Sequence, residues 1–320
     1  MRAWPLIKVL PVRTHFRFVR LSRIFAAISI VLVIASLVGA FYPGFNRGID
    51  FKGGTVLELS TPAPTDLAKV RSTVSSLNLG DVGVQNFATR DDPSGVRHVS
   101  VKFQTPDRTD PAATVTKVKT ALDTALGRVT YSRADVVGPK VSGELFRNGL
   151  MALGIAIGLM LIYIWFRFEL QFGLGAVAAL FHDVILTFGL ILLLRIELDL
   201  RLIAAILTVI GYSMNDTVVV FDRLRENLRK YKRMPLAEVI DHSINETLTR
   251  TVITGMTALL ALSGLAIFGG EALRDFSLVL MFGIAIGTYS SIYIASPVVL
   301  LWGVKRGEEV EIITPQGARP

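Results

Sequence analysis

Cysteine is missing from this chain of 320 residues, which excludes disulfides and thiol chemistry. Histidine is scarce, and its four occurrences (His15, His98, His182 and His242) lack the spacing of metal ligands, so we expect no metal site. Charged residues make up only 19% of the chain, whereas 51% of it is hydrophobic. This balance is typical of a membrane protein.

Long apolar runs take the place of the missing charges. A membrane-spanning helix needs roughly 20 mostly apolar residues. Six runs come close to this length or exceed it: 24–42, 149–166, 170–194, 202–221, 251–270 and 276–304. We therefore predict an α-helical polytopic membrane protein with six transmembrane helices. The first run is longer than the apolar part of a signal peptide, so we expect it to remain as an anchor.

Basic residues predict how the chain is oriented, because they collect on the cytoplasmic side of a membrane. They cluster in a leader (1–23), in a loop after the fourth run (222–250) and at the start of a tail (305–320). With six spans, all three segments and both termini lie in the cytoplasm. The net charge of +8 is then explained by topology, and no nucleic-acid partner is expected.

A polar segment, residues 43–144, separates the first span (24–42) from the five-helix bundle (145–304) and must lie on the other side of the membrane, in the periplasm. Its strand-like and helix-like patterns follow one another in the order β-α-β-β-α-β, the ferredoxin-like arrangement. No phosphate loop, nucleophile elbow or metal motif occurs in it. We expect this insert to be non-catalytic and to contact a partner or a substrate chain.

Two motifs flank the insert where it joins the spans. One contains Gly48, Asp50, Gly53 and Gly54, and the other contains Gly138 and Pro139. Glycine permits positive φ angles or close backbone approach and proline stiffens the chain, so we expect hinge or coupling motifs at a rigid joint. Asp50 is either part of this coupling or only a turn-forming residue.

Two carboxyl groups interrupt the apolar runs. Asp216 lies near the end of the fourth run, and such a charge is costly in a bilayer unless it is paired or protonated, so a functional role is the default. Arg250 begins the fifth run from the same side, and we expect it to approach Asp216. Asp183, beside His182 in the third run, is a second relay group or only a helix-packing site, and Asn215 is a further secondary candidate.

Polar and small residues also predict helix contacts. Thr247, Arg250, Thr251, Thr254 and Thr257 recur at helical spacing, as do Thr208, Tyr212 and Asn215, and we expect the two stripes to face each other across an interior seam. Small residues at 154 and 158, and at 283 and 287, favour close helix approach. The apolar face of residues 236–248 predicts a helix on the membrane surface.

Several motifs together carry a family resemblance. They are the flanking motifs, GYSMNDTVVVFDRLRE at 211–226, ITGMTALL at 253–260 and IFGG at 267–270. With the expected topology, they resemble SecF-type members of the SecD/SecF family of bacterial protein-export membrane proteins, within the resistance-nodulation-division superfamily. The resemblance implies a proton relay of Asp216 and Arg250, with protons as the coupling ion and no other cofactor.

It also implies the setting and the partners. These are the bacterial inner membrane and its lipid, a SecD subunit in a twelve-span complex, the SecYEG translocon with SecA, and translocating polypeptides. A stand-alone small-solute exporter of the same superfamily is the alternative function. An aspartyl intramembrane protease using Asp183 and Asp216 is less consistent with the sequence, because the residues around both aspartates differ from that class. We therefore do not expect an enzyme.

Overall fold

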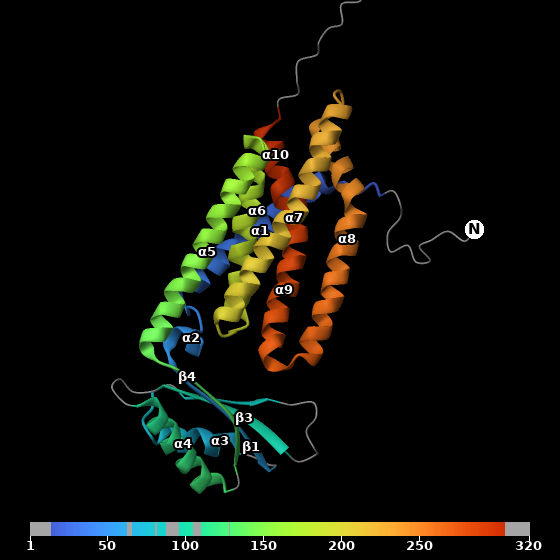
Figure 1. Cartoon of the computed structure of the whole chain (residues 1–320). Helices are drawn as coiled ribbons and strands as arrows, with labels where there is room; N and C mark the ends of the chain where they lie inside the picture. The colour runs from blue at the N-terminus through green and yellow to red at the C-terminus, as the bar shows by residue number, and fades with distance from the viewer. Residues whose placement is uncertain are drawn as a thin grey trace, which may run out of the picture.

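The structure is a computed structural model that describes residues 14–62, 66–80, 82–87, 96–104, 110–127 and 129–304. A bundle of long helices occupies most of it, and a small unit built on a β-sheet lies at one end of the bundle (Figure 1). Residues 1–13 of the predicted leader and the predicted tail, 305–320, lie outside the described residues.

Six helical segments are long and apolar enough to cross a membrane, as predicted. They are α1 (Phe18–Phe41), α5 (Pro139–Arg167), α6 (Leu170–Leu193), α7 (Leu200–Lys230), α8 (Leu236–Phe268) and a last span made of α9 (Gly270–Ser290), the π-helical turn η1 (Ser291–Ala295) and α10 (Ser296–Trp302). Several helices extend beyond the apolar runs, because their charged flanks contain arginine, lysine and glutamate, which are good helix formers.

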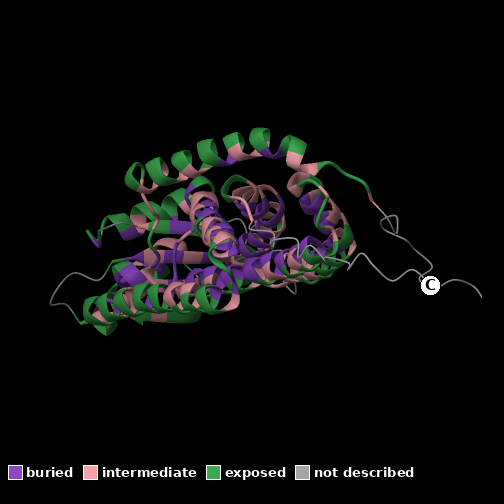
Figure 2. Cartoon of the chain, turned by 90° about the horizontal axis from the view of Figure 1, so that it is seen from above, coloured by how far each residue is buried: buried purple, intermediate pink, exposed green. Residues whose placement is uncertain are grey.

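The spans form a buried centre and an exposed periphery. Helices α6, α7 and the last span have about half of their membrane-length segments buried, whereas α1, α5 and α8 have less than a fifth buried. Figure 2 shows buried helices surrounded by largely exposed ones. Because lipid tails cover apolar side chains without a free-energy penalty, the exposed apolar faces of the outer helices are compatible with a membrane.

Small residues bring α7 and α9 close together. A Cβ atom added to Gly283 would lie 2.1 Å from Val209 Cγ2, and one added to Gly287 would lie 2.8 Å from Ser213 Cβ. The close approach predicted for this ridge is confirmed. A Cβ atom added to Gly154 or Gly158 would have no atom of the described chain within 4 Å. The close helix approach predicted at these two glycines is therefore not made within this chain.

The predicted surface helix after Pro235 is wrong. Residues from Leu236 onward belong to α8, which continues without a break to Phe268. The apolar side chains of Val239, Ile240 and Ile244 are buried in the core of the bundle rather than turned toward a membrane surface. The apolar periodicity of this segment is present in the helix, but periodicity does not distinguish a membrane surface from a neighbouring helix as the apolar partner.

The unit at the end of the bundle has a four-stranded antiparallel sheet. Its elements follow one another as β1 (Gly54–Pro62), α3 (Leu67–Ser75), β2 (Gly83–Phe87), β3 (Val96–Phe103), α4 (Pro111–Leu126) and β4 (Thr130–Val137). The strand order is β2-β3-β1-β4. In the central pairings, Leu57 lies opposite Val101 on one side and Ala134 on the other.

This unit has its own hydrophobic core. Helices α3 and α4 pack against one face of the sheet, and the core contains fully buried Leu57, Val101, Val70 and Val118. Both helices begin with an aspartate cap, as Asp66 and Asp110 each accept a hydrogen bond from the backbone amide two residues later. The unit is therefore a separately packed body attached through α2 (Ile49–Lys52) and the start of α5.

Candidate functional site

Asp216 is buried at the interface of α7 and α9, with 2% of its surface exposed. Its Oδ2 accepts a hydrogen bond from Thr288 Oγ1 of α9 at 3.0 Å. Close packing at Gly287 brings α9 near enough for this contact. Among the described residues, Thr288 is the one hydrogen-bond partner of this carboxyl group, and it is neutral. A carboxyl group in such a position has the surroundings expected of a group that binds and releases a proton.

Arg250 lies on α8, one of the outer helices, and its side chain is exposed. It is close enough to act on Asp216 through electrostatic attraction. Among the described residues, however, no hydrogen bond or ion pair joins the two side chains. The predicted approach is therefore only partial in this structure, and a direct ion pair would require a rearrangement of α8 or of the arginine side chain.

Asp183 and His182 occupy the centre of a larger polar cluster. Asp183 Oδ1 lies 2.8 Å from His182 Nδ1, and Asp183 Oδ2 accepts hydrogen bonds from Ser213 of α7 and from Ser290 of α9, the latter at 2.6 Å. His182 Nε2 lies 3.1 Å from Ser29 Oγ of α1. The cluster thus joins four helices. In the described chain, no hydrogen bond connects Asp183 with Asp216, so the two acids do not form a proton-sharing protease dyad.

Three of these partners, Ser29 of α1 and Thr288 and Ser290 of α9, were not identified from the sequence. Hydroxyl side chains are common in membrane helices, because they can bond to the carbonyl one turn earlier in the same helix. For Thr288 and Ser290 the sequence shows only that polar residues recur within one turn of the last span, and this is insufficient to select a partner.

The two predicted polar stripes do not face each other across one interior seam. Thr247 and Thr251 of α8 are buried, but Arg250, Thr254 and Thr257 are exposed. On α7, Thr208 and Asn215 are likewise exposed, so Asn215 points away from the buried acids. The structure therefore divides these polar residues between the interior and a surface that this chain leaves uncovered.

The flanking motifs meet at the joint between the sheet unit and the bundle. Gly53 and Gly54 have φ angles of +75° and +137°. A Cβ at Gly54 would lie 2.8 Å from Phe103 O, and one at Gly53 would lie 3.3 Å from Val137 O and 3.6 Å from Pro139 Cα. Side chains at both positions would therefore strain the backbone or collide with it.

The rest of the joint connects directly to the spans. Gly48 donates its backbone N–H to Leu198 O at 2.9 Å, and Asp50 Oδ2 accepts a hydrogen bond from Leu200 N at 3.1 Å. Asp50 thus caps the first turn of α7. Gly138 is the N-cap residue of α5 and Pro139 opens its first turn.

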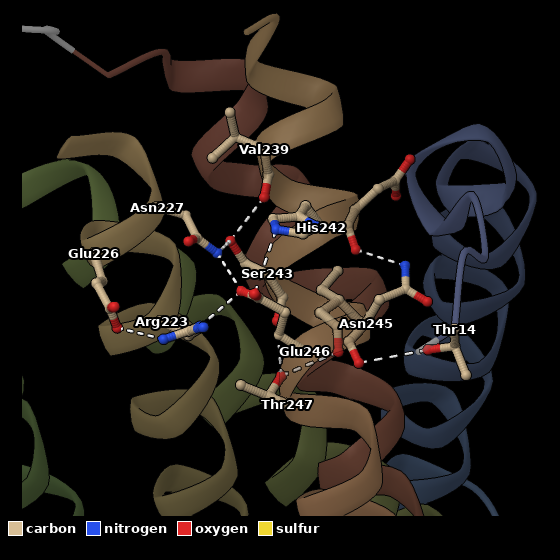
Figure 3. Close-up of polar contacts among 12 residues, drawn as sticks. Thr14, Arg223, Glu226, Asn227, Val239, His242, Ser243, Asn245, Glu246 and Thr247 are labelled. Carbon is tan, nitrogen blue, oxygen red and sulfur yellow. Dashed lines mark hydrogen bonds and ion pairs between the residues drawn. The ribbon is translucent and has the colours of Figure 1, made fainter. Parts of the chain in front are cut away.

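A second polar cluster links the other ends of α7 and α8. Arg223 donates to Glu246 at 2.7 Å, and Asn227 donates to Ser243 at 3.0 Å and to Glu246 at 2.7 Å. Figure 3 shows these side chains pointing toward one another from the two helices. This cluster fixes the hairpin between the fourth and fifth spans, and with it the position of Arg250 one turn further along α8.

A nearby contact fixes the chain before α1. Asn245 of α8 accepts a hydrogen bond from Phe16 N at 2.9 Å and donates one to Phe16 O at 2.8 Å. Asp241 accepts from Val19 N at 2.9 Å, so a carboxylate from α8 caps the start of α1. The first and fifth spans are thereby joined at one end of the bundle.

Comparison with known proteins agrees with this architecture. Residues 117–305 match the family described as "Protein export membrane protein SecD/SecF, C-terminal", and residues 43–61, which include the glycines of the joint, match the "SecD/SecF GG Motif". A protein translocase subunit SecF of Cereibacter sphaeroides is 44% identical over 306 residues, 94% of each chain. One of Rickettsia bellii is 40% identical over 310 residues, 97% of this chain and 100% of the relative.

Two solved structures are also similar. A crystal structure of SecDF from Thermus thermophilus, titled a translocon-associated membrane protein, has a TM-score of 0.80 at 34% identity and covers 92% of this chain. A crystal structure of SecDF in a super-membrane-facing form has a TM-score of 0.67 at 35% identity and covers 93%. The chain spans only 40% of the length of either SecDF chain.

Six apolar spans, acids buried between them and one sheet-containing unit define a polytopic membrane protein of the transport type. Within this class, the family is identified by relatives that match 94–97% of the chain at 40–44% identity. The chain belongs to the SecD/SecF family of protein-export membrane proteins.

Proposed function

We propose that this chain is a SecF-type accessory subunit of the Sec protein translocase in the bacterial inner membrane. With a SecD subunit, it uses the proton-motive force to promote late translocation and release of exported polypeptides delivered by SecYEG and SecA. The names of the relatives support this role, since they match almost the whole chain and are translocase subunits. They do not favour a stand-alone solute exporter, and none of them is named as an enzyme.

The observation that carries the proton-coupled mechanism is the environment of Asp216. Its carboxyl group is buried and, within the described part of the chain, is hydrogen-bonded only to Thr288; it is subject to the positive charge of Arg250, with which it forms no ion pair there. A shift of Arg250 toward Asp216 would favour the carboxylate, and a shift away would favour the protonated acid. Such alternation loads and releases a proton, the only coupling ion we propose.

The energy released by proton passage is sufficient to shift an equilibrium between two conformations. One proton crossing the membrane supplies about 2.3 kcal/mol per 100 mV of potential. Equilibria between two conformations typically differ by a few kcal/mol, so the passage of one or two protons biases such an equilibrium strongly. No other cofactor is required by this scheme.

An uncovered surface on α7 and α8 supports a SecD partner. On α7, the small or polar residues Ala204, Thr208, Gly211 and Asn215 are exposed in one stripe, and a Cβ at Gly211 would meet no described atom within 4 Å. Small residues permit close helix approach and polar residues need partners in a membrane. We propose that six further spans from SecD cover this surface, completing a twelve-span body. The greater length of the similar SecDF chains is consistent with this arrangement.

The sheet unit is proposed to be a ferredoxin-like domain on the periplasmic side, with both termini of the chain in the cytoplasm. Its element and strand order support the fold, and the basic residues that follow α7 support the orientation. The two SecDF structures match this chain to the same extent but with different TM-scores, so the matched region has different arrangements in them. A domain that moves on the joint is positioned to act on an emerging polypeptide.

The test compares two aspartates on the same helix. Asp216→Asn removes the titrating group and keeps its shape, whereas Asp222→Asn changes an exposed aspartate whose ion pair with Arg167 is at the surface. Export into vesicles containing the full translocase is measured with and without a proton gradient. We expect Asp216→Asn to abolish the stimulation by the gradient and Asp222→Asn to retain it. Full stimulation in Asp216→Asn would refute the mechanism.

A further inference from the structure

His182 and Asp183 are buried titratable groups that the proposed Asp216 mechanism does not use. They are 6% and 1% exposed and lie in a continuous chain of hydrogen bonds from α1 to α9. We propose that this pair is a second proton-binding site, and that in this structure it holds one proton between His182 Nδ1 and Asp183 Oδ1. The argument follows from counting the hydrogens along the chain.

The count begins at Tyr289, whose hydroxyl has one hydrogen. That hydrogen is donated to Phe25 O, a pure acceptor, at 2.8 Å. Ser29 must therefore be the donor in its 2.8 Å contact with the Tyr289 oxygen. Having used its only hydrogen, Ser29 can only accept in its 3.1 Å contact with His182 Nε2. His182 Nε2 consequently carries a hydrogen.

The other ring nitrogen then determines the proton count of the pair. A neutral imidazole with a hydrogen on Nε2 has a bare, accepting Nδ1. Asp183 Oδ1, 2.8 Å away, is also an acceptor when the carboxyl group is ionised. Two acceptors do not form a hydrogen bond, so this contact needs an additional proton. The pair is then either imidazolium with carboxylate or imidazole with carboxylic acid, and its net charge is 0 in both cases.

The surroundings agree with a neutral pair. The groups that face it are the Tyr289 ring stacked on His182 at 5.9 Å between centroids, the hydroxyls of Ser29, Ser213 and Ser290, and, one turn from Ser213 on α7, Asp216. Within the described residues, no lysine or arginine forms an ion pair with Asp183. An uncompensated carboxylate would be strongly disfavoured at this depth.

Release of the proton changes the hydrogen bonds between helices. The remaining hydrogen then belongs on Nδ1, where Asp183 accepts it, and Nε2 becomes an acceptor. The Ser29 hydroxyl must turn from Tyr289 to His182, which removes one of the two hydrogen bonds that join Tyr289 of α9 to α1 and keeps the one to Phe25 O. Proton occupancy is thereby linked to the packing of the first span.

The location also connects this site with Asp216. Ser213 and Asp216 are three residues apart on α7, about 4.5 Å along the helix axis. In the loading step, protonated Asp216 becomes a carboxylate while the pair changes from a charge of −1 to 0. This coupling rests on the proposed function, whereas the presence of the second site does not.

Nitrogen NMR tests the site directly. The chain has only four histidines, so full-length chain labelled with ¹⁵N-histidine and reconstituted in lipid with its SecD partner gives few signals, and His182→Gln assigns the one of interest. We expect Nε2 to carry a hydrogen at pH 7, and the pH is then raised until the pair releases its proton. A bare Nε2 at pH 7 would overturn the proposal.

Two serine variants of α1 test the hydrogen count through their effect on proton release. With the proton bound, Ser29 accepts from Nε2 and donates to Tyr289, whereas after release it bonds only to Nε2. Ser29→Ala therefore removes one more hydrogen bond from the proton-bound state, and release should occur at a pH about one unit lower, a tenfold weaker proton affinity. Ser36→Ala is the control, because the one partner of the Ser36 hydroxyl among the described residues is Leu32 O of its own helix, at 2.8 Å. Equal titrations of the two variants would contradict the hydrogen count.

Export measurements test the coupling separately. Asp183→Asn is compared with Asp216→Asn in the gradient-dependent export assay. We expect at least a tenfold loss of gradient stimulation in each. Loss in Asp216→Asn with full stimulation in Asp183→Asn overturns the second site as part of the relay and leaves the proposed function intact. Full stimulation in Asp216→Asn refutes the proposed function, while the NMR result still decides whether the second site exists.

Discussion

Gly287 provides a sensitive test of the packing that brings the acids together. A Cβ at this position would lie 2.8 Å from Ser213 Cβ and 3.0 Å from Ser213 Cα, whereas ordinary carbon contacts are about 3.5–4.0 Å. Gly287→Ala therefore requires α7 and α9 to separate by roughly 0.5–1 Å, and overpacking of this kind typically costs about 1–3 kcal/mol. The better helix propensity of alanine offsets about 0.5–1 kcal/mol of that cost. We expect a net destabilisation of about 1–2 kcal/mol.

Gly158→Ala is the matched control, because a Cβ there would meet no atom within 4 Å in the described chain. Only the helix-propensity gain applies, so this variant should be as stable as the unmodified chain or up to about 1 kcal/mol more stable. Both variants are unfolded from detergent micelles with increasing dodecyl sulfate while the helical circular dichroism is followed. If Gly287→Ala proved as stable as Gly158→Ala, the close approach of α7 and α9 would be refuted.

Two further predictions concern the sheet unit and the start of the first span. Burial, together with the hydrogen bond to Asp123, raises the pKa of Tyr131 above its usual value of 10, so the stability this tyrosine provides is present below pH 10 and is lost as the pH rises toward the folded-state pKa. Tyr131→Phe should therefore weaken the alkaline loss of stability, measured by thermal unfolding at several pH values; an identical loss in both chains would contradict this. Asn245→Ala removes both hydrogen bonds to Phe16, so trypsin should cleave the chain faster at Arg17, and an unchanged rate would show that this contact does not hold the segment.

The sequence was most informative where one physical requirement dominates. Each span needs a long apolar run, and each element of the insert needs apolar residues with a period of two or near 3.6, so the six spans and the strand and helix order were recoverable. A carboxyl group in an apolar run is rare enough that Asp216 and Asp183 stood out without any knowledge of their neighbours.

The partners of these acids depend on how the helices are rotated and packed. Ser290 reaches Asp183 only because α9 lies against α6 and α7, and no local pattern specifies that arrangement. Arg250 and Asn215 have the expected spacing but lie on exposed faces, because helical periodicity identifies a stripe without identifying what covers it. The same ambiguity produced the wrong surface helix before the fifth span.

The hydrogen bond between Asp50 and Leu200 has a mechanical consequence. Asp50 belongs to the short helix that carries the sheet unit, and Leu200 N is the first amide of the helix that contains Asp216. A displacement of α2 that preserves this bond must also displace the first turn of α7. A helix is stiff along its axis, so the movement is transmitted over 16 residues, about 24 Å, to the depth of Asp216. A force applied to the sheet unit is thus transmitted along α7 and changes the spacing around Asp216.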